Sequence, residues 1–199
     1  MDRREPDEAS AARIAAALAA LNDADPVVRA QAAWTLGLVG DARATDPLLG
    51  ALTDPDSRVR EQAAWALGLK GDRRIVPALL AALDDAEPVV RERAAWALGL
   101  KGDERAIDPL IAHLTDTVAS VREQAAWALG QRGDRRAVEP LTAAASDAVA
   151  TVRDMARWSL GMLDVGQDLE LDLSRLNVTF GEVVAEALKV IQTGRGDQQ

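Results

Sequence analysis

The sequence predicts an all-α solenoid, and three observations support that prediction. The string VREQAAWALGLKGD at residues 59–72 recurs almost unchanged along most of the chain. The chain is rich in alanine, with no Tyr and one Phe, which favours helices over sheets. One step of 31 residues separates all five tryptophans: Trp34, Trp65, Trp96, Trp127 and Trp158. A repeat of about 20 to 50 residues is typical of solenoids, in which each unit buries its apolar face against its neighbours.

The net charge and the lack of targeting signals argue against nucleic-acid and membrane partners. The net charge of −9 argues against nucleic acid, because phosphate binding requires a clustered basic surface. The N-terminal residues lack the apolar core of a signal peptide, and no run of about 18 apolar residues could span a bilayer. We therefore expect a cytoplasmic protein without membrane contact.

Residues that carry chemistry are scarce. The chain has no cysteine, and His113 is its only histidine. A thiolate site, a His-rich metal site and a Ser-His-Asp arrangement with a second acid–base each need residues that are lacking. We therefore predict a non-catalytic protein with neither metal nor cofactor, and we expect His113 on the surface of a helix.

The solenoid is predicted over residues 9–163, after a disordered segment at residues 1–8. A first helix from about Ala9 to Leu21 matches the end of later units, so the chain begins with a half repeat. Every later unit should contain two helices, named B and A here in chain order. Five B helices and four complete A helices result.

Capping residues mark the ends of these helices. An acidic residue and a proline should open the B helix as N-cap and first helical residue, at Asp25-Pro26, Asp54-Pro55 and Glu87-Pro88. A left-handed glycine should close it, at Gly40, Gly71, Gly102 and Gly133. The aspartate that follows each glycine should cap the A helix, whose early proline should bend its first turn.

The repeat pattern ends after Trp158. Residues 164–178 contain the alternation DLELDL, which is typical of an extended segment. A last amphipathic helix is predicted over residues 179–193, and residues 194–199 should be disordered. Its apolar stripe includes four residues suited to docking in a groove: Phe180, Val184, Leu188 and Ile191.

The repeat resembles the short bacterial HEAT-like repeats found in phycobilin lyases and in designed alpha-repeat scaffolds. The resemblance covers about residues 11–163 and is carried by the AAxALG string, the Gly-Asp turn, the proline of the A helix and a Val-Arg pair. The pairs are Val28-Arg29, Val59-Arg60, Val90-Arg91, Val121-Arg122 and Val152-Arg153. The resemblance implies a right-handed α-α superhelix with the B helices on the concave side, where the designed scaffolds bind.

Helical geometry gives the tryptophans a face of their own. At about 100° per residue, Val59, Ala63 and Leu67 share the side that packs on helix A, and Trp65 lies about 150° away. Neighbouring helices about 8–10 Å apart make the five rings a ladder about 40 Å long. Charged, amide and leucine side chains flank the rings: Arg58, Glu61, Gln62, Leu69, Glu92, Arg93, Leu100, Glu123, Gln124, Gln131 and Asp154.

The tryptophan ladder has two interpretations. Exposed rings would be hot spots for a protein or peptide, and the carboxylates beside them would favour Lys or Arg side chains of that partner. An extended peptide of about 12 residues would span the ladder. Alternatively, each indole lies over the adjacent repeat and completes the packing between units. The C-terminal helix could cap the solenoid, dock in this groove or that of a second copy, or bind a separate partner.

The repeated arginines from Arg29 to Arg153 could form an anion site, but the pattern favours a ladder of structural ion pairs. We expect each to pair with an aspartate of a Gly-Asp turn and so tie neighbouring units together.

The predicted function is a non-catalytic scaffold that binds a protein or peptide through the tryptophan ladder. One alternative, implied by the resemblance, is a phycobilin-lyase-like enzyme or chaperone that holds a tetrapyrrole. Another is a purely structural or engineered repeat scaffold.

Overall fold

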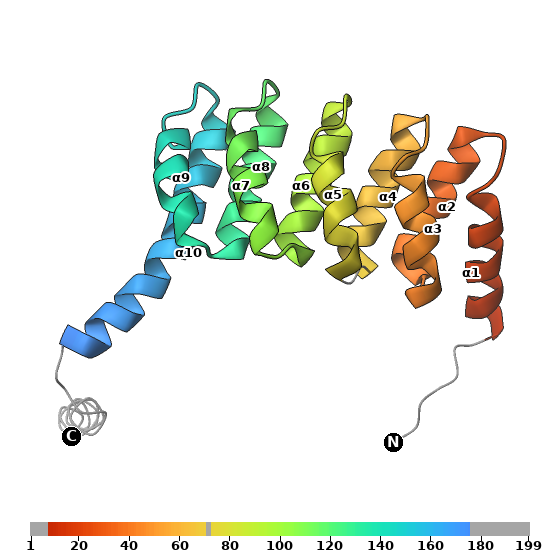
Figure 1. Ribbon diagram of the computed structural model, residues 1–199, viewed down its shortest axis with the longest axis horizontal. Coiled ribbons are helices and arrows are strands. Elements are labelled where there is room, and N and C mark those ends of the chain that lie inside the picture. The colour runs from red at the N-terminus through yellow and green to blue at the C-terminus, as the bar shows by residue number, and fades with distance from the viewer. Residues whose placement is uncertain (1–7, 71–72, 176–199) are drawn as a thin grey trace, which may run out of the picture. The chain divides into compact units, whose positions relative to one another are not determined.

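A computed structural model describes residues 8–70 and 73–175, with side chains placed over residues 10–70 and 73–163. The regular elements in these ranges are all helical, and up to residue 163 the helices of successive units stack side by side (Figure 1). The predicted fold class is confirmed. Residues 1–163 and 164–199 form separate units, and the sites described below lie in the first.

The helices follow the predicted order. The B helices are α2 (Pro26–Val39), α4 (Ser57–Lys70), α6 (Pro88–Lys101), α8 (Ala119–Arg132) and α10 (Ala150–Arg175). The A helices are α1 (Glu8–Ala20), which is the half repeat, α3 (Thr45–Ala51), α5 (Val76–Ala82), α7 (Ile107–Ala112) and α9 (Val138–Ala144). Short 3₁₀ turns lead into the last four A helices at Ala42–Ala44, Arg73–Ile75, Glu104–Ala106 and Arg135–Ala137, and His113–Thr115 follows α7.

The core uses the same positions in successive units. Val59, Ala63 and Leu67 of α4 are fully buried, and their spacing places them on one side of the helix. Leu98 of α6 and Leu79 of α5 are equally buried. Burial of a leucine side chain stabilises the fold by about 1.5–3 kcal/mol. Because each unit contacts only its neighbours, this stabilisation is spread along the array.

The glycines that end the B helices adopt two conformations. Gly133 has a φ of 69°, the left-handed C-cap that the sequence predicts. Gly40 and Gly102 have φ angles of −62° and −59°, so that prediction is wrong for both. They provide room instead, since a Cβ on Gly40 would lie 2.2 Å from the carbonyl oxygen of Leu36. Gly71 lies outside the described residues.

The acidic N-caps are confirmed in part. Asp25 caps α2 by accepting a hydrogen bond from a backbone N–H two residues on. α4 begins at Ser57, later than predicted, because Asp56 accepts the capping hydrogen bond in place of Asp54. Glu87 makes no side-chain cap. The aspartates of the described Gly-Asp turns cap the 3₁₀ turns: Asp41, Asp103 and Asp134.

The extended segment predicted over residues 164–178 is wrong where the structure describes it. α10 continues as a helix to Arg175. The leucine, glutamate and glutamine of this segment are good helix formers, no proline interrupts it, and a helix that has already nucleated extends at little cost. Residues 1–7 and 176–199, which include the predicted helix over 179–193, lie outside the described residues.

Candidate functional site

The B helices present the tryptophans on one surface, called the Trp face here. Trp34 and Trp158 are 42% and 45% exposed. Trp65, Trp96 and Trp127 are half-buried and pack against the core. The five rings therefore occupy two environments, open at the two ends of the row and closed in its middle.

Glycines explain the closed middle of the row. A Cβ on Gly68 would lie 2.6 Å from Cζ3 of Trp96, and a Cβ on Gly99 would lie 2.6 Å from Cζ3 of Trp127. Each of these rings thus lies against the glycine of the preceding B helix and completes the seam between units. Trp34 belongs to the first B helix, so no such glycine precedes it.

A second apolar row follows the tryptophans. Its members lie four residues after a tryptophan, which places them on the same side of the helix. The exposed members are Leu38, Leu69, Leu100 and Met162, at 47%, 38%, 41% and 49% exposure, and Gln131 takes the equivalent place in α8. Sequence reasoning included three of these five positions and missed Leu38 and Met162, although the repeat spacing could have identified both.

Charged side chains flank these rows unevenly. Glu61 of α4 and Arg93 of α6 form an ion pair at 3.4 Å across the seam. Arg58 turns back to its own helix start and pairs with Asp56 at 2.7 Å. Asp154 is 75% exposed and forms only a loose pair, 3.6 Å, with Arg157. The remaining predicted polar residues, Glu92, Glu123 and Gln124, lie on α6 and α8 and are half-buried.

Two pockets flank Trp34. The larger, about 450 Å³, is lined by Val27, Ala30, Gln31, Trp34, Arg58, Glu61 and Gln62. The smaller, about 300 Å³, is lined by Trp34, Gln62, Trp65 and Arg93. The structure thus gathers five other predicted site residues around the exposed ring of Trp34.

The arginine ladder exists, but its predicted partners are wrong. The four arginines from Arg29 to Arg122 each pair across the seam with the aspartate 25 residues later, in the turn before the next B helix. The pairs are Arg29–Asp54, Arg60–Asp85, Arg91–Asp116 and Arg122–Asp147, at 2.8, 2.7, 2.8 and 2.7 Å.

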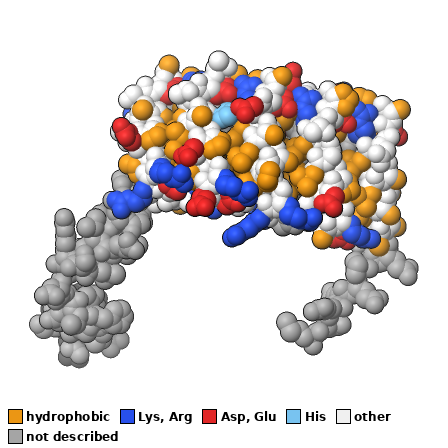
Figure 2. Space-filling model, in the orientation of Figure 1, with side chains coloured by type: hydrophobic (Ala, Val, Ile, Leu, Met, Phe, Trp, Pro, Cys, Tyr) orange, Lys and Arg blue, Asp and Glu red, His pale blue; other side chains and the backbone are white. Residues whose placement is uncertain are grey.

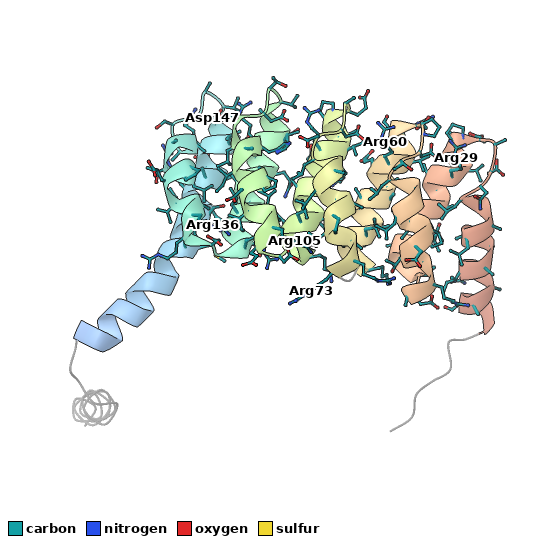
Figure 3. The ribbon with its side chains drawn as sticks, viewed as in Figure 1. Arg29, Arg60, Arg73, Arg105, Arg136 and Asp147 are labelled. Carbon is teal, nitrogen blue, oxygen red and sulfur yellow. The ribbon has the colours of Figure 1, made fainter. Side chains whose placement is uncertain are left out.

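Distance explains the error. The Gly-Asp turns lie at the far end of each B helix, about 20 Å from the arginine at its start. Arg29, Arg60 and Asp147 lie along one edge of the array, and Arg105 and Arg136 lie along the other (Figure 3). Charged side chains line both edges, with hydrophobic side chains between them (Figure 2).

The ion pairs shift the pKa values of the carboxylates. The hydrogen bond from Arg29 lowers the pKa of Asp54, and burial opposes that effect. Beside Arg58, the pKa of Asp56 falls to about 2. The hydrogen bond from Arg105 likewise lowers the pKa of Asp103 to about 2.

We expect the protein to lose stability in acid. Carboxylates with a lower pKa in the folded chain stabilise it above their unfolded pKa, 3.8, and that stabilisation is lost as the pH falls from about 4 toward 2. Melting temperatures recorded across the pH scale should be level near neutrality and fall below about pH 4. Replacing Arg58 and Arg105 with Gln should weaken this dependence, and a melting temperature that rises below pH 4 would contradict the prediction.

His113 joins two units rather than lying on the surface as predicted. Its Nδ1 lies 2.8 Å from the carbonyl oxygen of Pro109, and its Nε2 lies 2.7 Å from that of Leu83 in the preceding unit. The side chain is 13% exposed. The equivalent residue of the next unit, Ala144, lines a pocket of about 460 Å³ together with Leu114, so the imidazole fills space that alanine leaves open.

Over the ranges with placed side chains, no group of His, Cys, Asp and Glu could hold a metal ion. No helix among the described residues is long and apolar enough to cross a membrane.

Comparison with known proteins agrees with this architecture. A family model for HEAT repeats matches residues 14–86 and 76–161. A chain in the structure of the complex of CpcE and CpcF of phycocyanin lyase from Nostoc sp. PCC7120 is 28% identical with a TM-score of 0.69, over 82% of this chain and 68% of that chain. No curated protein sequence matches the chain.

Two structures of engineered proteins share the fold. One engineered protein is 23% identical with a TM-score of 0.60, over 81% of this chain and 85% of that chain. A designed armadillo repeat protein is 19% identical with a TM-score of 0.56, over 78% of this chain and 84% of that chain.

Proposed function

The chain belongs to the HEAT repeat family, and on this basis we propose that it is a non-catalytic scaffold that binds a protein or peptide along its Trp face. The observation that carries the proposal is the row of exposed apolar side chains four residues after the tryptophans, together with the exposed rings at the two ends of the tryptophan row. These side chains include Trp34, Leu38, Leu69 and Leu100. Contiguous exposed apolar surface is typical of binding sites.

The proposed anchor is Trp34. Tryptophan is enriched among residues that dominate binding energy, and such residues lie in pockets with a polar rim. Trp34 has an exposed ring between two pockets, and Arg58 and Gln62 supply polar groups at the rim. An apolar side chain of the partner would fill the larger pocket, and its backbone could hydrogen-bond to the amide of Gln62.

Charge distribution suggests how a partner would lie. Glu61 is already paired with Arg93, whereas Asp154 is 75% exposed and only loosely paired. A Lys or Arg of the partner would therefore be favoured toward α8 and α10, near Asp154 and Trp158. The proposed docking of the chain's own residues Phe180 to Ile191 on this face concerns residues outside the described ranges.

A peptide library tests the proposal directly. Peptides of about 12 residues, displayed on phage, would be selected on the full chain and measured by fluorescence anisotropy. Trp34→Ala should weaken binding at least tenfold, or about 1.4 kcal/mol, as for a hot-spot residue. Thr142→Ala on α9, an exposed residue of an A helix, is the matched control and should leave binding unchanged. Equal binding to both variants would overturn the assignment of the Trp face.

The similarity to the phycocyanin lyase structure supports a second candidate function. The tetrapyrrole alternative predicted from the sequence would use the Trp face, where exposed indoles could stack on the rings of the ligand. Adding a free bilin to the full chain should then shift its visible absorption, and Trp34→Ala should abolish the shift. An unchanged bilin spectrum would rule this candidate out without affecting the peptide-binding proposal.

A further inference from the structure

The two ends of the repeat array expose opposite halves of one interface. Inside the array, the side of a B helix that faces the next unit carries the ladder arginine and, eight residues on, a glycine. The side that faces the preceding unit carries the valine equivalent to Val59 and the tryptophan. It lies next to the aspartate, in the turn before the helix, that pairs with the arginine of the preceding unit. The first end, formed by α1 and α2, exposes only the second set. At the last end, formed by α9 and the start of α10, no placed side chain covers the first set, and Trp158 is also exposed there.

Asp23 is the unpaired aspartate at the first end. It occupies the position of Asp54 and Asp85 in its unit, and it accepts the same backbone hydrogen bond from the residue two positions on, at 2.8 Å. Those aspartates each hold an arginine of the preceding unit. Asp23 is exposed and forms no ion pair with the side chains that the structure places.

Arg153 is the unpaired arginine at the last end. Its Nη1 donates to the carbonyl oxygens of Asp147 and Ala148 at 2.8 and 3.0 Å, as Arg29 does to those of Asp23 and Ala24. Arg29 and its later equivalents also use Nε and Nη2 to bind a carboxylate. For Arg153, no placed side chain supplies that carboxylate, so the guanidinium is held in position with its outer edge open.

The apolar contacts of the interface are divided in the same way. Val28 is 38% exposed, whereas Val59 and its later equivalents are fully buried. Trp34 is exposed at the first end. At the last end, Gly161 has no placed heavy atom within 4 Å of the position of a Cβ, whereas the same position at Gly37 is 2.7 Å from the ring of Trp65.

The first end is also hollowed. A groove of about 500 Å³ lies between α1 and α2. Alanines and valines dominate its lining: Ala16, Ala17, Ala20, Val27, Val28 and Ala32, with Arg13, Gln31 and Thr35. A helix of a further unit would fill this groove and bury the exposed valines.

We propose that the first end binds the last end of a second copy of this chain. In this head-to-tail contact Arg153 of one copy binds Asp23 of the next, and Trp34 of the next copy lies over Gly161. The contact repeats the geometry of the seams within the chain. Because it joins two different surfaces, each bound copy leaves one free surface of each kind, and further copies can bind in the same orientation. The opposite charges of Asp23 and Arg153 and the uncovered Gly161 indicate that the partner is a second copy of this chain.

Arg157 tunes the strength of this contact. It lies midway between Arg153 and Gly161 on the same side of α10 and replaces the buried alanine of every earlier unit, such as Ala126. Its side chain is 61% exposed and contacts Asp154 and the carbonyl oxygen of Ala145. A second copy must displace this long side chain, so the contact is weak and reversible.

Sedimentation velocity on the full chain over a range of concentrations tests the proposal. The weight-average mass should rise with concentration, and Arg157→Ala should tighten association about tenfold by removing a side chain that must otherwise be ordered. Arg135→Ala, at an exposed arginine in the turn before α9, is the matched control and should associate as the unmodified chain does. A monomer at all concentrations, both unmodified and with Arg157→Ala, would overturn the proposal.

Charge reversal identifies the contact. Asp23→Arg and Arg153→Asp should each weaken association at least about tenfold, because each places like charges together. The two changes in one chain exchange the partners and should restore it. Association that persists in both single variants, or that the double variant fails to restore, would show that a different surface joins the copies. Circular dichroism melts of each variant would confirm that the array stays folded.

Discussion

Replacing Asp116 with Asn is expected to lower the free energy of unfolding by about 2–4 kcal/mol. The Asp116 carboxylate accepts two hydrogen bonds from Arg91, at 2.8 and 2.9 Å, and one from the N–H of Val118 at 2.8 Å. The side chains of Arg91 and Asp116 are only 13% and 9% exposed. Removing the negative charge leaves a half-buried guanidinium without its counter-ion, which costs more than the pair itself contributes.

Urea unfolding measures this loss, and hydrogen exchange locates it. Because each unit contacts only its neighbours, faster exchange should be confined to α6, α8 and the turn before α8 that carries Asp116. Arg43→Gln is the control, since the Arg43–Asp41 pair is 59% and 43% exposed and exposed pairs contribute little. If Asp116→Asn and Arg43→Gln unfold alike, the ladder does not hold the units together.

Gly99→Ala is expected to destabilise the protein by about 1–3 kcal/mol, although alanine is normally the better helix residue by about 1 kcal/mol. A Cβ at Gly99 would lie 2.6 Å from Cζ3 of Trp127 and 3.0 Å from the Cα of Ala128. The ring could move outward, but the backbone of α8 could not move without separating the two helices. The seam between α6 and α8 would therefore open.

Two further variants isolate the steric cause. Gly50→Ala in α3 meets no heavy atom within 4 Å, so it should leave stability unchanged or raise it by up to about 1 kcal/mol. Trp127→Leu should be less costly in the Gly99→Ala background than alone, because the smaller side chain makes room for the new methyl group. Thermal melts of the unmodified chain, the three single variants and the double variant give both comparisons, and a strictly additive double variant would contradict the steric explanation.

The arginine ladder shows that the sequence predicts which residues tie the units together but not which aspartate each arginine binds. The period of 31 residues identified Arg29 and its equivalents as tying residues, and the expectation of pairing between units was sound. Two sets of repeated aspartates were available as partners, and periodicity cannot distinguish them. Only the folded chain shows that the turn before the next B helix, with Asp54, lies beside Arg29, while the Gly-Asp turns lie at the opposite edge.

The Trp face shows a similar division. Helical spacing placed the tryptophans opposite the side that packs on helix A, and the repeat does not distinguish one tryptophan from another. In the structure, Trp96 lies against Gly68, whereas Trp34 is exposed because no B helix precedes it. A repeat makes residues equivalent in sequence, but its ends remove neighbours and so change exposure.

By itself, the sequence determined that this chain is a helical solenoid of 31-residue units, because period and helix propensity are local properties written into each repeat. It also determined which residues recur at the seams. Tertiary structure alone decided which aspartate each arginine binds, which glycines provide room rather than a left-handed turn, and which rings stay open. These outcomes depend on which atoms of different units come within a few ångströms, and that distance is fixed only when the helices pack.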